Sequence, residues 1–145
     1  INYYTRDFIQ FNLARGFDVL TKPEFPKSDL GWEIYPQGIY DVIMDAHLKY
    51  RKPIIITENG LADHKDEKRK KFLKDHLTYV LRALHHGAKV EGYCHWSLLD
   101  NFEWSEGFIP RFGFYEVNYK TFERTLRPSG IHFEKIAREN KIVHE

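Results

Sequence analysis

A carboxylate in residues 54–60, Ile-Ile-Ile-Thr-Glu-Asn-Gly, stands where catalytic groups are often found. Three β-branched residues and a Thr predict a buried strand, and Asn59-Gly60 is a strong turn signal. Glu58 therefore lies where a strand meets a loop, which is where parallel α/β folds place their catalytic residues. A Glu beside a turn is more often simply solvated, so this position alone leaves both interpretations open.

A second group of polar and aromatic side chains follows another expected strand. It contains Trp96, Asp100, Asn101, Glu103 and Trp104. The carboxyl ends of parallel strands share one rim of a sheet, so this group is expected on the same rim as Glu58. These are the residue types of a carbohydrate site, because indole faces stack on a pyranose and carboxylates accept paired hydrogen bonds from vicinal hydroxyls. The alternative is a buried Trp pair with acids that only cap backbone groups, and the group alone favours neither.

The elements that must position these side chains alternate between strands and helices. A strand is expected over residues 1–4, followed by a long polar connection with Pro23, Pro26 and Gly31 that largely lacks regular structure. Helices are expected at about 36–50, 65–86 and 129–139, and strands at 54–57, 90–96 and 112–119, the last as in a hairpin. Asp63 is the expected N-cap of the middle helix and Gly87 its C′ residue. This order is typical of an α/β fold with parallel strands and right-handed crossovers.

The number of strands is too small for a closed sheet. A parallel sheet of three strands leaves two bare edges, and its strands need cover on both faces. An eight-unit barrel removes those edges but needs roughly 250 residues. The chain, which does not begin with Met, is therefore expected to be the C-terminal portion, about three βα units, of a (β/α)8 TIM barrel. Residues 1–145 would form one segment of a single barrel domain, and the rest would come from a second chain or segment.

Composition excludes several classes of protein. With 42% hydrophobic and 30% charged residues the chain is not disordered, and no apolar run is long enough for a membrane span. The 22 Lys and Arg balance 21 Asp and Glu, so neither nucleic acid nor an anionic membrane is expected as partner. The mixed charges of residues 65–71 are expected to form a solvated helix face. Cys94 is the single cysteine, which indicates a reducing compartment and a cytoplasmic location, and no metal or cofactor motif is present.

Four sequence blocks, in this order, resemble the C-terminal part of glycoside hydrolase family 1, the β-glucosidase and β-galactosidase family. They are Asn-Tyr-Tyr-Thr at 2–5, Gly-Trp-Glu-Ile-Tyr-Pro-Gln-Gly at 31–38, Ile-Thr-Glu-Asn-Gly at 56–60, and His95 to Trp104 with Arg-Phe-Gly at 111–113. Glu-Asn-Gly alone is a weak signal. The four blocks together, spread over most of the chain, are a strong one.

The resemblance implies a role for each matching residue. Glu58 matches the catalytic nucleophile, which forms a covalent glycosyl-enzyme that water later hydrolyses with retention of configuration. Tyr4 matches the tyrosine that hydrogen-bonds this carboxylate. The implied substrate-binding residues are Trp96, Glu103, Trp104, Phe112 and, as weaker matches, Asn2 and Trp32. The carboxylate of Glu103 would repel a phosphate, so neutral β-glycosides or oligosaccharides are the implied substrates.

The family's general acid/base, a Glu in an Asn-Glu-Pro sequence, is missing from this chain. A retaining glycosidase needs two carboxyl groups, so the chain alone is expected to be inactive until the N-terminal portion of the barrel is supplied. Two other interpretations of the chain's function stay open. One is a non-catalytic carbohydrate-binding remnant, and the other is a structural barrel fragment whose exposed strand edges drive homo-oligomerisation.

Overall fold

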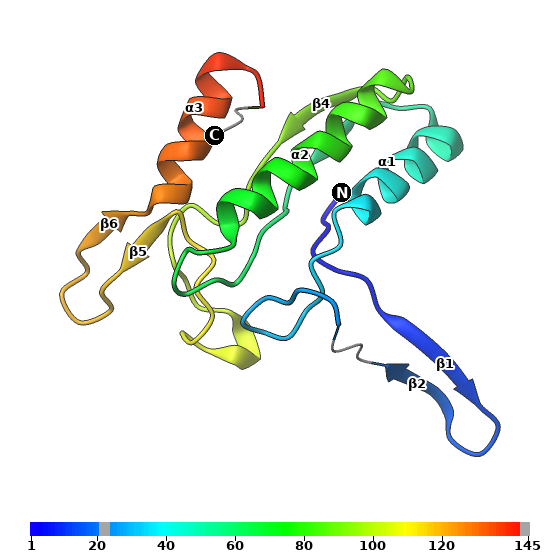
Figure 1. Cartoon of the computed structure of the whole chain (residues 1–145), viewed down its shortest axis with the longest axis horizontal. Helices are drawn as coiled ribbons and strands as arrows, with labels where there is room; N and C mark the ends of the chain where they lie inside the picture. The colour runs from blue at the N-terminus through cyan, green and yellow to red at the C-terminus, as the bar shows by residue number, and fades with distance from the viewer. Residues whose placement is uncertain (21–23, 143–145) are drawn as a thin grey trace.

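The computed structural model describes residues 1–20 and 24–142, and three parallel segments at its centre position the carboxylate of Glu58 (Figure 1). Strand β3 (Ile54–Ile56) pairs in parallel with β4 (Val90–Tyr93). On the other side of β3 the expected strand over residues 1–4 is shorter than predicted, because only Asn2 forms a bridge, with Glu58. Two backbone hydrogen bonds hold it there, from Thr57 N to Ile1 O (2.9 Å) and from Tyr3 N to Glu58 O (3.0 Å). The expected α/β pattern of parallel segments joined through helices is therefore present.

Two helices, α1 (Gln37–Tyr50) and α2 (Arg69–His85), cover one face of these parallel segments. Successive strand residues point to opposite faces, so Ile54 and Ile56 are buried against the helices while Ile55 is 51% exposed on the other face. Ile39 and Ile43 of α1 complete this core. Parallel sheets are normally covered on both faces, and in this chain the face of Ile55 is open.

Helix α2 begins later than the sequence predicts. The N-cap residue is Lys68 rather than the expected Asp63, although Asp63 Oδ2 accepts hydrogen bonds from the backbone N–H of Lys68 (2.8 Å) and Arg69 (3.0 Å) at the start of the helix. The residues between are a turn rather than the expected solvated helix face. Asp66 lies in this turn with a φ of 58° and accepts hydrogen bonds from Ser129 N (2.8 Å) and Ser129 Oγ (2.6 Å). Asp66, which the sequence predicts on a solvated helix face, thus links the start of α2 to the start of α3.

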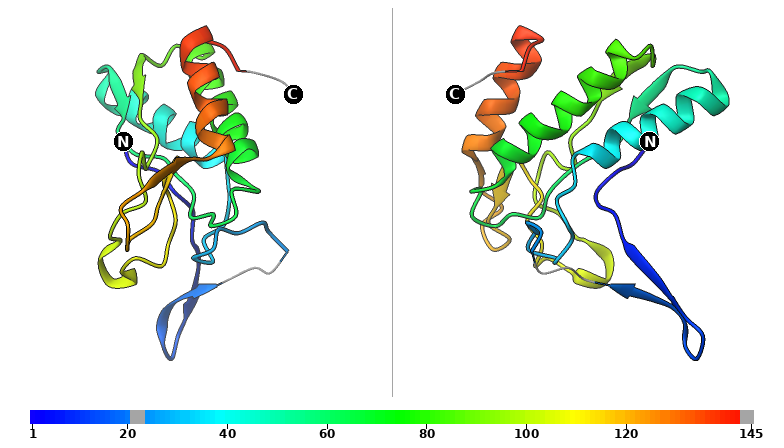
Figure 2. Two further views of the ribbon diagram at one scale, coloured as in Figure 1. Left: turned by 90° about the vertical axis from the view of Figure 1, so that its left-hand side faces the viewer. Right: turned by 45° about the vertical axis from the view of Figure 1, so that its right-hand side comes forward.

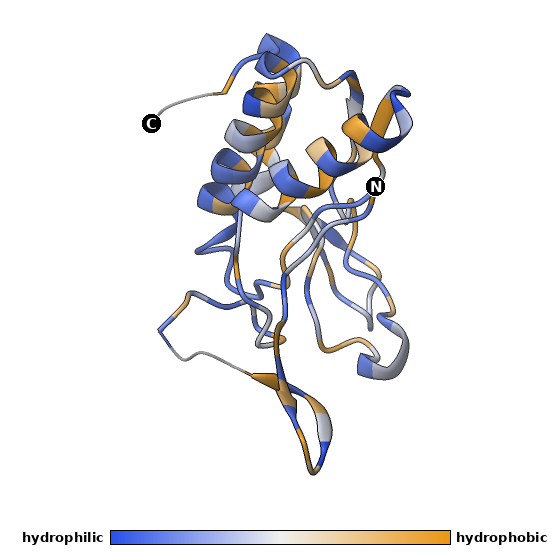
Figure 3. Cartoon of the chain, turned by 90° about the vertical axis from the view of Figure 1, so that its right-hand side faces the viewer, coloured by the Kyte–Doolittle hydropathy of each residue, from blue (hydrophilic) through white to orange (hydrophobic). Residues whose placement is uncertain are grey.

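The connection expected to be irregular contains a β-hairpin instead, formed by β1 (Phe8–Asn12) and β2 (Gly16–Leu20). Its turn is stabilised by Asn12 Oδ1, which accepts the backbone N–H of Ala14 (2.9 Å), and by Gly16 at a φ of 79°. The hairpin projects away from the helices in every view (Figure 2) and is largely hydrophobic (Figure 3). Of the three residues named in that expectation, Pro23 lies outside the described residues.

The C-terminal third carries the loop of the second residue group. A 3-10 turn, η1 (Trp104–Glu106), is followed by a short antiparallel pair, β5 (Tyr115–Val117) and β6 (Arg124–Leu126), which confirms a hairpin in that region. Helix α3 (Pro128–Glu139) has Pro in its first turn and ends at Asn140 in the left-handed conformation. None of the helices described has the length and apolar character needed to cross a membrane.

Candidate active site

Glu58 and Tyr4 meet at the carboxyl ends of neighbouring parallel segments. The Tyr4 hydroxyl donates a hydrogen bond to Glu58 Oε2 across 2.9 Å. Burial, and then the hydrogen bond and charge of Glu58, raise the pKa of Tyr4 above its ordinary range. Tyr4 is therefore a hydrogen-bond donor at neutral pH, and its hydroxyl orients the Glu58 carboxylate.

Two aromatic rings hold Tyr4 in place. Phe112, which is 2% exposed, meets the Tyr4 ring edge-on with centroids 6.1 Å apart, and Trp32 does so at 5.8 Å. Phe112 and Trp32 also contact each other at 6.3 Å. Phe112, a candidate substrate contact, is thus packed behind Tyr4, while Trp32 is 40% exposed beside it.

The segment after Glu58 passes very close to the backbone at Trp96, where the loop of the second residue group begins. A Cβ at Gly60 would lie 1.8 Å from the backbone oxygen of Trp96, so only glycine fits. This approach lets Trp96 N donate to the Asn59 carbonyl (3.0 Å). The Asn-Gly pair, expected from local pattern to form a turn, instead allows Trp96 to lie against Asn59, the residue after Glu58.

Trp96 and Glu103, from the two ends of one loop, form a second pair of site residues. The indole Nε1 of Trp96 donates to Glu103 Oε1 across 3.0 Å, and both side chains are half-buried. A carboxylate accepts several hydrogen bonds, so this contact orients Glu103 without using its acceptor capacity for sugar hydroxyls. Asn2, the weaker candidate, lies beside Glu58 and accepts a hydrogen bond at 2.5 Å from Thr57 Oγ1.

Trp104 is the candidate that the structure does not bring to this group. It lies on η1, is 82% exposed, and contacts the ring of Phe102. The backbone at Trp104 has a φ of 50° and begins a tight turn, in which Glu103 N donates to Gly107 O (2.7 Å). Trp104 as a sugar contact remains a prediction.

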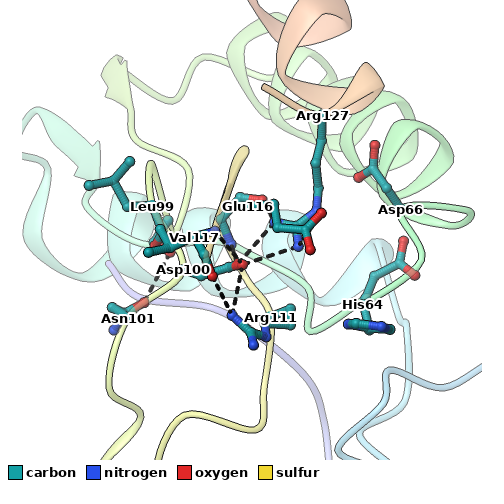
Figure 4. A network of polar contacts seen from close by, with 12 residues as sticks. His64, Asp66, Leu99, Asp100, Asn101, Arg111, Glu116, Val117 and Arg127 are labelled. Carbon is teal, nitrogen blue, oxygen red and sulfur yellow. Dashed lines mark hydrogen bonds and ion pairs between the residues drawn. The ribbon is translucent and has the colours of Figure 1, made fainter. Parts of the chain in front are cut away.

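Asp100 belongs to the alternative that the sequence left open, that of buried acids with structural partners. Its side chain is fully buried and accepts two hydrogen bonds from Arg127, at 3.0 and 3.1 Å, and one from Arg111 at 3.3 Å (Figure 4). The backbone N–H groups of Gly113 (2.9 Å) and Val117 (3.2 Å) also donate to it. Asp100 anchors the loop that ends in Glu103, and residue type alone could not separate this role from sugar binding.

No group of three His, Cys, Asp or Glu side chains among residues 1–20 and 24–142 has the arrangement of a metal site. The chemistry of this rim is that of carboxylates, a phenol and indoles. Carboxylates and aromatic rings thus lie together at the carboxyl ends of parallel segments in an α/β fold, the edge where such folds place their active sites.

Comparison with known proteins identifies the family of this chain. The family model described as "Glycosyl hydrolase family 1" matches residues 2–142. The chain is 41% identical over 163 residues to a β-galactosidase of Pyrococcus woesei. The alignment covers 99% of this chain and 32% of that protein. The chain therefore belongs to glycosyl hydrolase family 1.

Solved structures agree with this assignment. A β-glucosidase of Thermotoga maritima in complex with methoxycarbonyl-substituted glucoimidazole superposes with a TM-score of 0.93 at 34% identity, covering 98% of this chain and 35% of that chain. A β-glycosidase of Pyrococcus horikoshii gives a TM-score of 0.91 at 42% identity, covering 99% and 34%. The chain spans about a third of the length of the relatives that it matches.

Proposed function

We propose that this chain is the nucleophile-bearing C-terminal part, about three βα units, of the barrel of a retaining β-glycosidase. The observation that carries the proposal is the hydrogen bond from Tyr4 to Glu58 at the ends of two neighbouring parallel segments. Relatives named β-galactosidase and β-glucosidase support the reaction class. On this proposal residues 1–145 are one segment of a single barrel domain.

In the proposed reaction Glu58 attacks the anomeric carbon of a β-glycoside. The bond to the aglycone oxygen breaks as a covalent glycosyl-enzyme forms, and water then hydrolyses this ester with net retention of configuration. Tyr4 donates to the carboxylate before attack and so fixes the oxygen that reacts. The aglycone oxygen must receive a proton from a second carboxyl group.

The substrate class follows from Glu103 and Trp96. A carboxylate that is already oriented by an indole N–H accepts hydrogen bonds from vicinal hydroxyls, and it repels a phosphate at the same position. Terminal glucosyl or galactosyl residues of neutral β-glycosides or oligosaccharides fit this pair. Trp96 would lie under the sugar ring, with Trp104, Phe112 and Asn2 as further binding residues.

A complementary barrel segment completes the proposed enzyme. The sheet face at Ile55 is open, although parallel strands are normally covered on both faces. The missing units would cover this face and bring the acid/base Glu to the rim. We therefore propose that the chain alone does not turn over substrate, and that the assembled enzyme works in a reducing, cytoplasmic setting suited to the unpaired Cys94.

The test is hydrolysis of a chromogenic aryl β-glucoside by the chain with and without the complementary segment. A 2-deoxy-2-fluoro glycoside is then used to trap the glycosyl-enzyme, and mass spectrometry locates the label. We expect turnover only after assembly and a label on Glu58, with neither in Glu58→Gln. Turnover by the chain alone, or a label elsewhere, would overturn the proposal.

Two other results would identify a different function. Sugar affinity without hydrolysis in the assembled protein indicates a carbohydrate-binding remnant. A solution mass that rises with concentration, with no sugar affinity, indicates a structural fragment that associates through its strand edges.

A further inference from the structure

The side chain of Asn59, next to the proposed nucleophile, links two neighbouring segments of the sheet. Asn59 is fully buried. Its Nδ2 donates to the backbone oxygen of Tyr3 (2.8 Å), and its Oδ1 accepts the hydroxyl hydrogen bond of Tyr93 (2.7 Å). Tyr3 directly precedes Tyr4, and Tyr93 is the last residue of β4, so one amide contacts the segments on both sides of Glu58.

The side-chain amide of Asn59 links the segments beyond the point where the regular backbone pairing of the strands ends. Strand β3 ends at Ile56, where Cys94 N, just after β4, donates to Ile56 O (2.8 Å). Beyond that point Tyr3 N donates to Glu58 O and Trp96 N donates to Asn59 O, each at 3.0 Å. The amide of Asn59 thus adds a buried side-chain link to the backbone hydrogen bonds from Tyr3 N to Glu58 O and from Thr57 N to Ile1 O, which join Glu58 and its neighbour to the segment that carries Tyr4.

The orientation of the amide is determined by its partners. A backbone carbonyl only accepts, so the atom facing Tyr3 O must be the nitrogen, and the oxygen must then face Tyr93. Burial raises the pKa of Tyr93, so its hydroxyl remains a donor. An ionised Asp could not donate to Tyr3, and an apolar residue would leave both partners unpaired.

We propose that Asn59 is a positioning residue that sets the separation between Tyr4 and Glu58 by holding the Tyr3 carbonyl. Asn59 does not touch the substrate, and it acts through Tyr4. This inference rests on the proposed function, because it assigns a role in presenting the Glu58 carboxylate for attack. A displacement of about 1 Å in the groups that position a nucleophile is enough to slow such a step.

The test is a double-mutant cycle with Tyr4→Phe and Asn59→Ala in the enzyme assembled with its complementary segment. The measured quantity is the rate constant of inactivation at saturating 2-deoxy-2-fluoro glycoside, with the half-saturating concentration recorded separately. We expect Asn59→Ala to slow inactivation about tenfold when Tyr4 is present and less than about twofold in the Tyr4→Phe background, with half-saturation nearly unchanged. Equal slowing in both backgrounds would overturn the proposal, because a merely structural residue acts independently of Tyr4.

A milder variant covers the case in which Asn59→Ala does not fold. Tyr93→Phe removes only the hydroxyl that orients the amide, and we expect slower inactivation that again disappears with Tyr4→Phe. Tyr40→Phe is the matched control, because the Tyr40 hydroxyl is bonded to His86, the residue after α2 (2.7 Å), and its loss should leave inactivation unchanged. Tyr93→Phe with normal inactivation would also refute the role of Asn59. Failure of the proposed function is distinct, since the unsubstituted enzyme would then carry no label on Glu58.

Discussion

The indole N–H of Trp96 and the carboxylate of Glu103 close a loop of eight residues at its two ends, 3.0 Å apart. The middle of the same loop is anchored by Asp100, which lies under it with Arg127. The position of Glu103 is thus fixed in the absence of a sugar, by the hydrogen bond of its side chain with Trp96 and by the anchoring of its loop through Asp100. Preorganisation of this kind reduces the entropy lost when hydroxyl groups are bound.

Replacing Glu103 by Gln should weaken sugar binding more than it slows chemistry. The amide retains the shape but loses the charge that strengthens hydrogen bonds from two hydroxyls, so KM should rise about tenfold or more with a smaller change in kcat. Steady-state kinetics of the assembled enzyme on an aryl β-glucoside measure both values. Glu106→Gln, on the exposed side of η1, is the control and should change neither. An unchanged KM in Glu103→Gln would remove Glu103 from the binding site.

Replacing Asp100 by Asn should destabilise the protein strongly. The change leaves Arg127 and Arg111 facing a neutral amide in a buried position, and breaking a buried pair costs about 3–5 kcal/mol. Urea unfolding of the assembled protein measures the loss. Glu134→Gln breaks the exposed pair with Arg138 and should cost less than about 0.5 kcal/mol. A similar small loss for both variants would show that Asp100 does not anchor the loop.

Local patterns in the sequence predicted the elements that carry the proposed nucleophile. Three β-branched residues located β3, and the helical periodicity before Pro53 located α1 within one residue. The turn expected at Asn59-Gly60 is not formed, because these residues continue as irregular chain beside Trp96. The hairpin β1–β2 was missed because its strands are short and alternate only weakly. The late start of α2 was missed because Asp66 forms its hydrogen bonds with Ser129, which is 63 residues away.

The contacts within the site, like those of α2, join residues that are distant in the sequence and so could not be predicted from local patterns. Glu58 and Tyr4 were paired through a family resemblance, and their contact depends on a parallel bridge between residues 56 positions apart that no local pattern predicts. Asp100 and Glu103 are both acids on one loop, three residues apart. One is buried against arginines and the other faces the rim, and this difference depends on Arg127 from a later element.

Two buried histidines should make the protein sensitive to acid. Burial lowers the pKa of His76 to about 4, and burial followed by the charge of Arg69 lowers the pKa of His95 to about 3. Both values lie below the unfolded value of about 6.5, so below pH 6.5 the unfolded chain takes up protons that the folded chain does not. The free energy of unfolding should therefore be constant above about pH 7 and fall from pH 6.5 towards 4, by up to about 1.4 kcal/mol per pH unit for each histidine.

Denaturant unfolding of the assembled protein between pH 7.5 and 4.5 measures this slope. His76→Phe, which preserves an aromatic ring next to Phe72, should reduce the slope, whereas His64→Gln, at an exposed position, should leave it unchanged. An identical slope in the unsubstituted protein and His76→Phe would show that His76 is protonated in the folded state as easily as in the unfolded one.

The open sheet face should be the surface that receives the complementary segment. Ile55 on this face and Ile131 on α3 are the same residue type with similar exposure, 51% and 57%, but only Ile55 would lie inside the completed barrel. Ile55→Lys would bury an unpaired charge there, so it should abolish the activity gained on adding the segment. Ile131→Lys should assemble normally, because its side chain stays in water. Size-exclusion chromatography and aryl β-glucoside turnover of the two mixtures report assembly and activity, and normal assembly of Ile55→Lys would show that the barrel interior lies elsewhere.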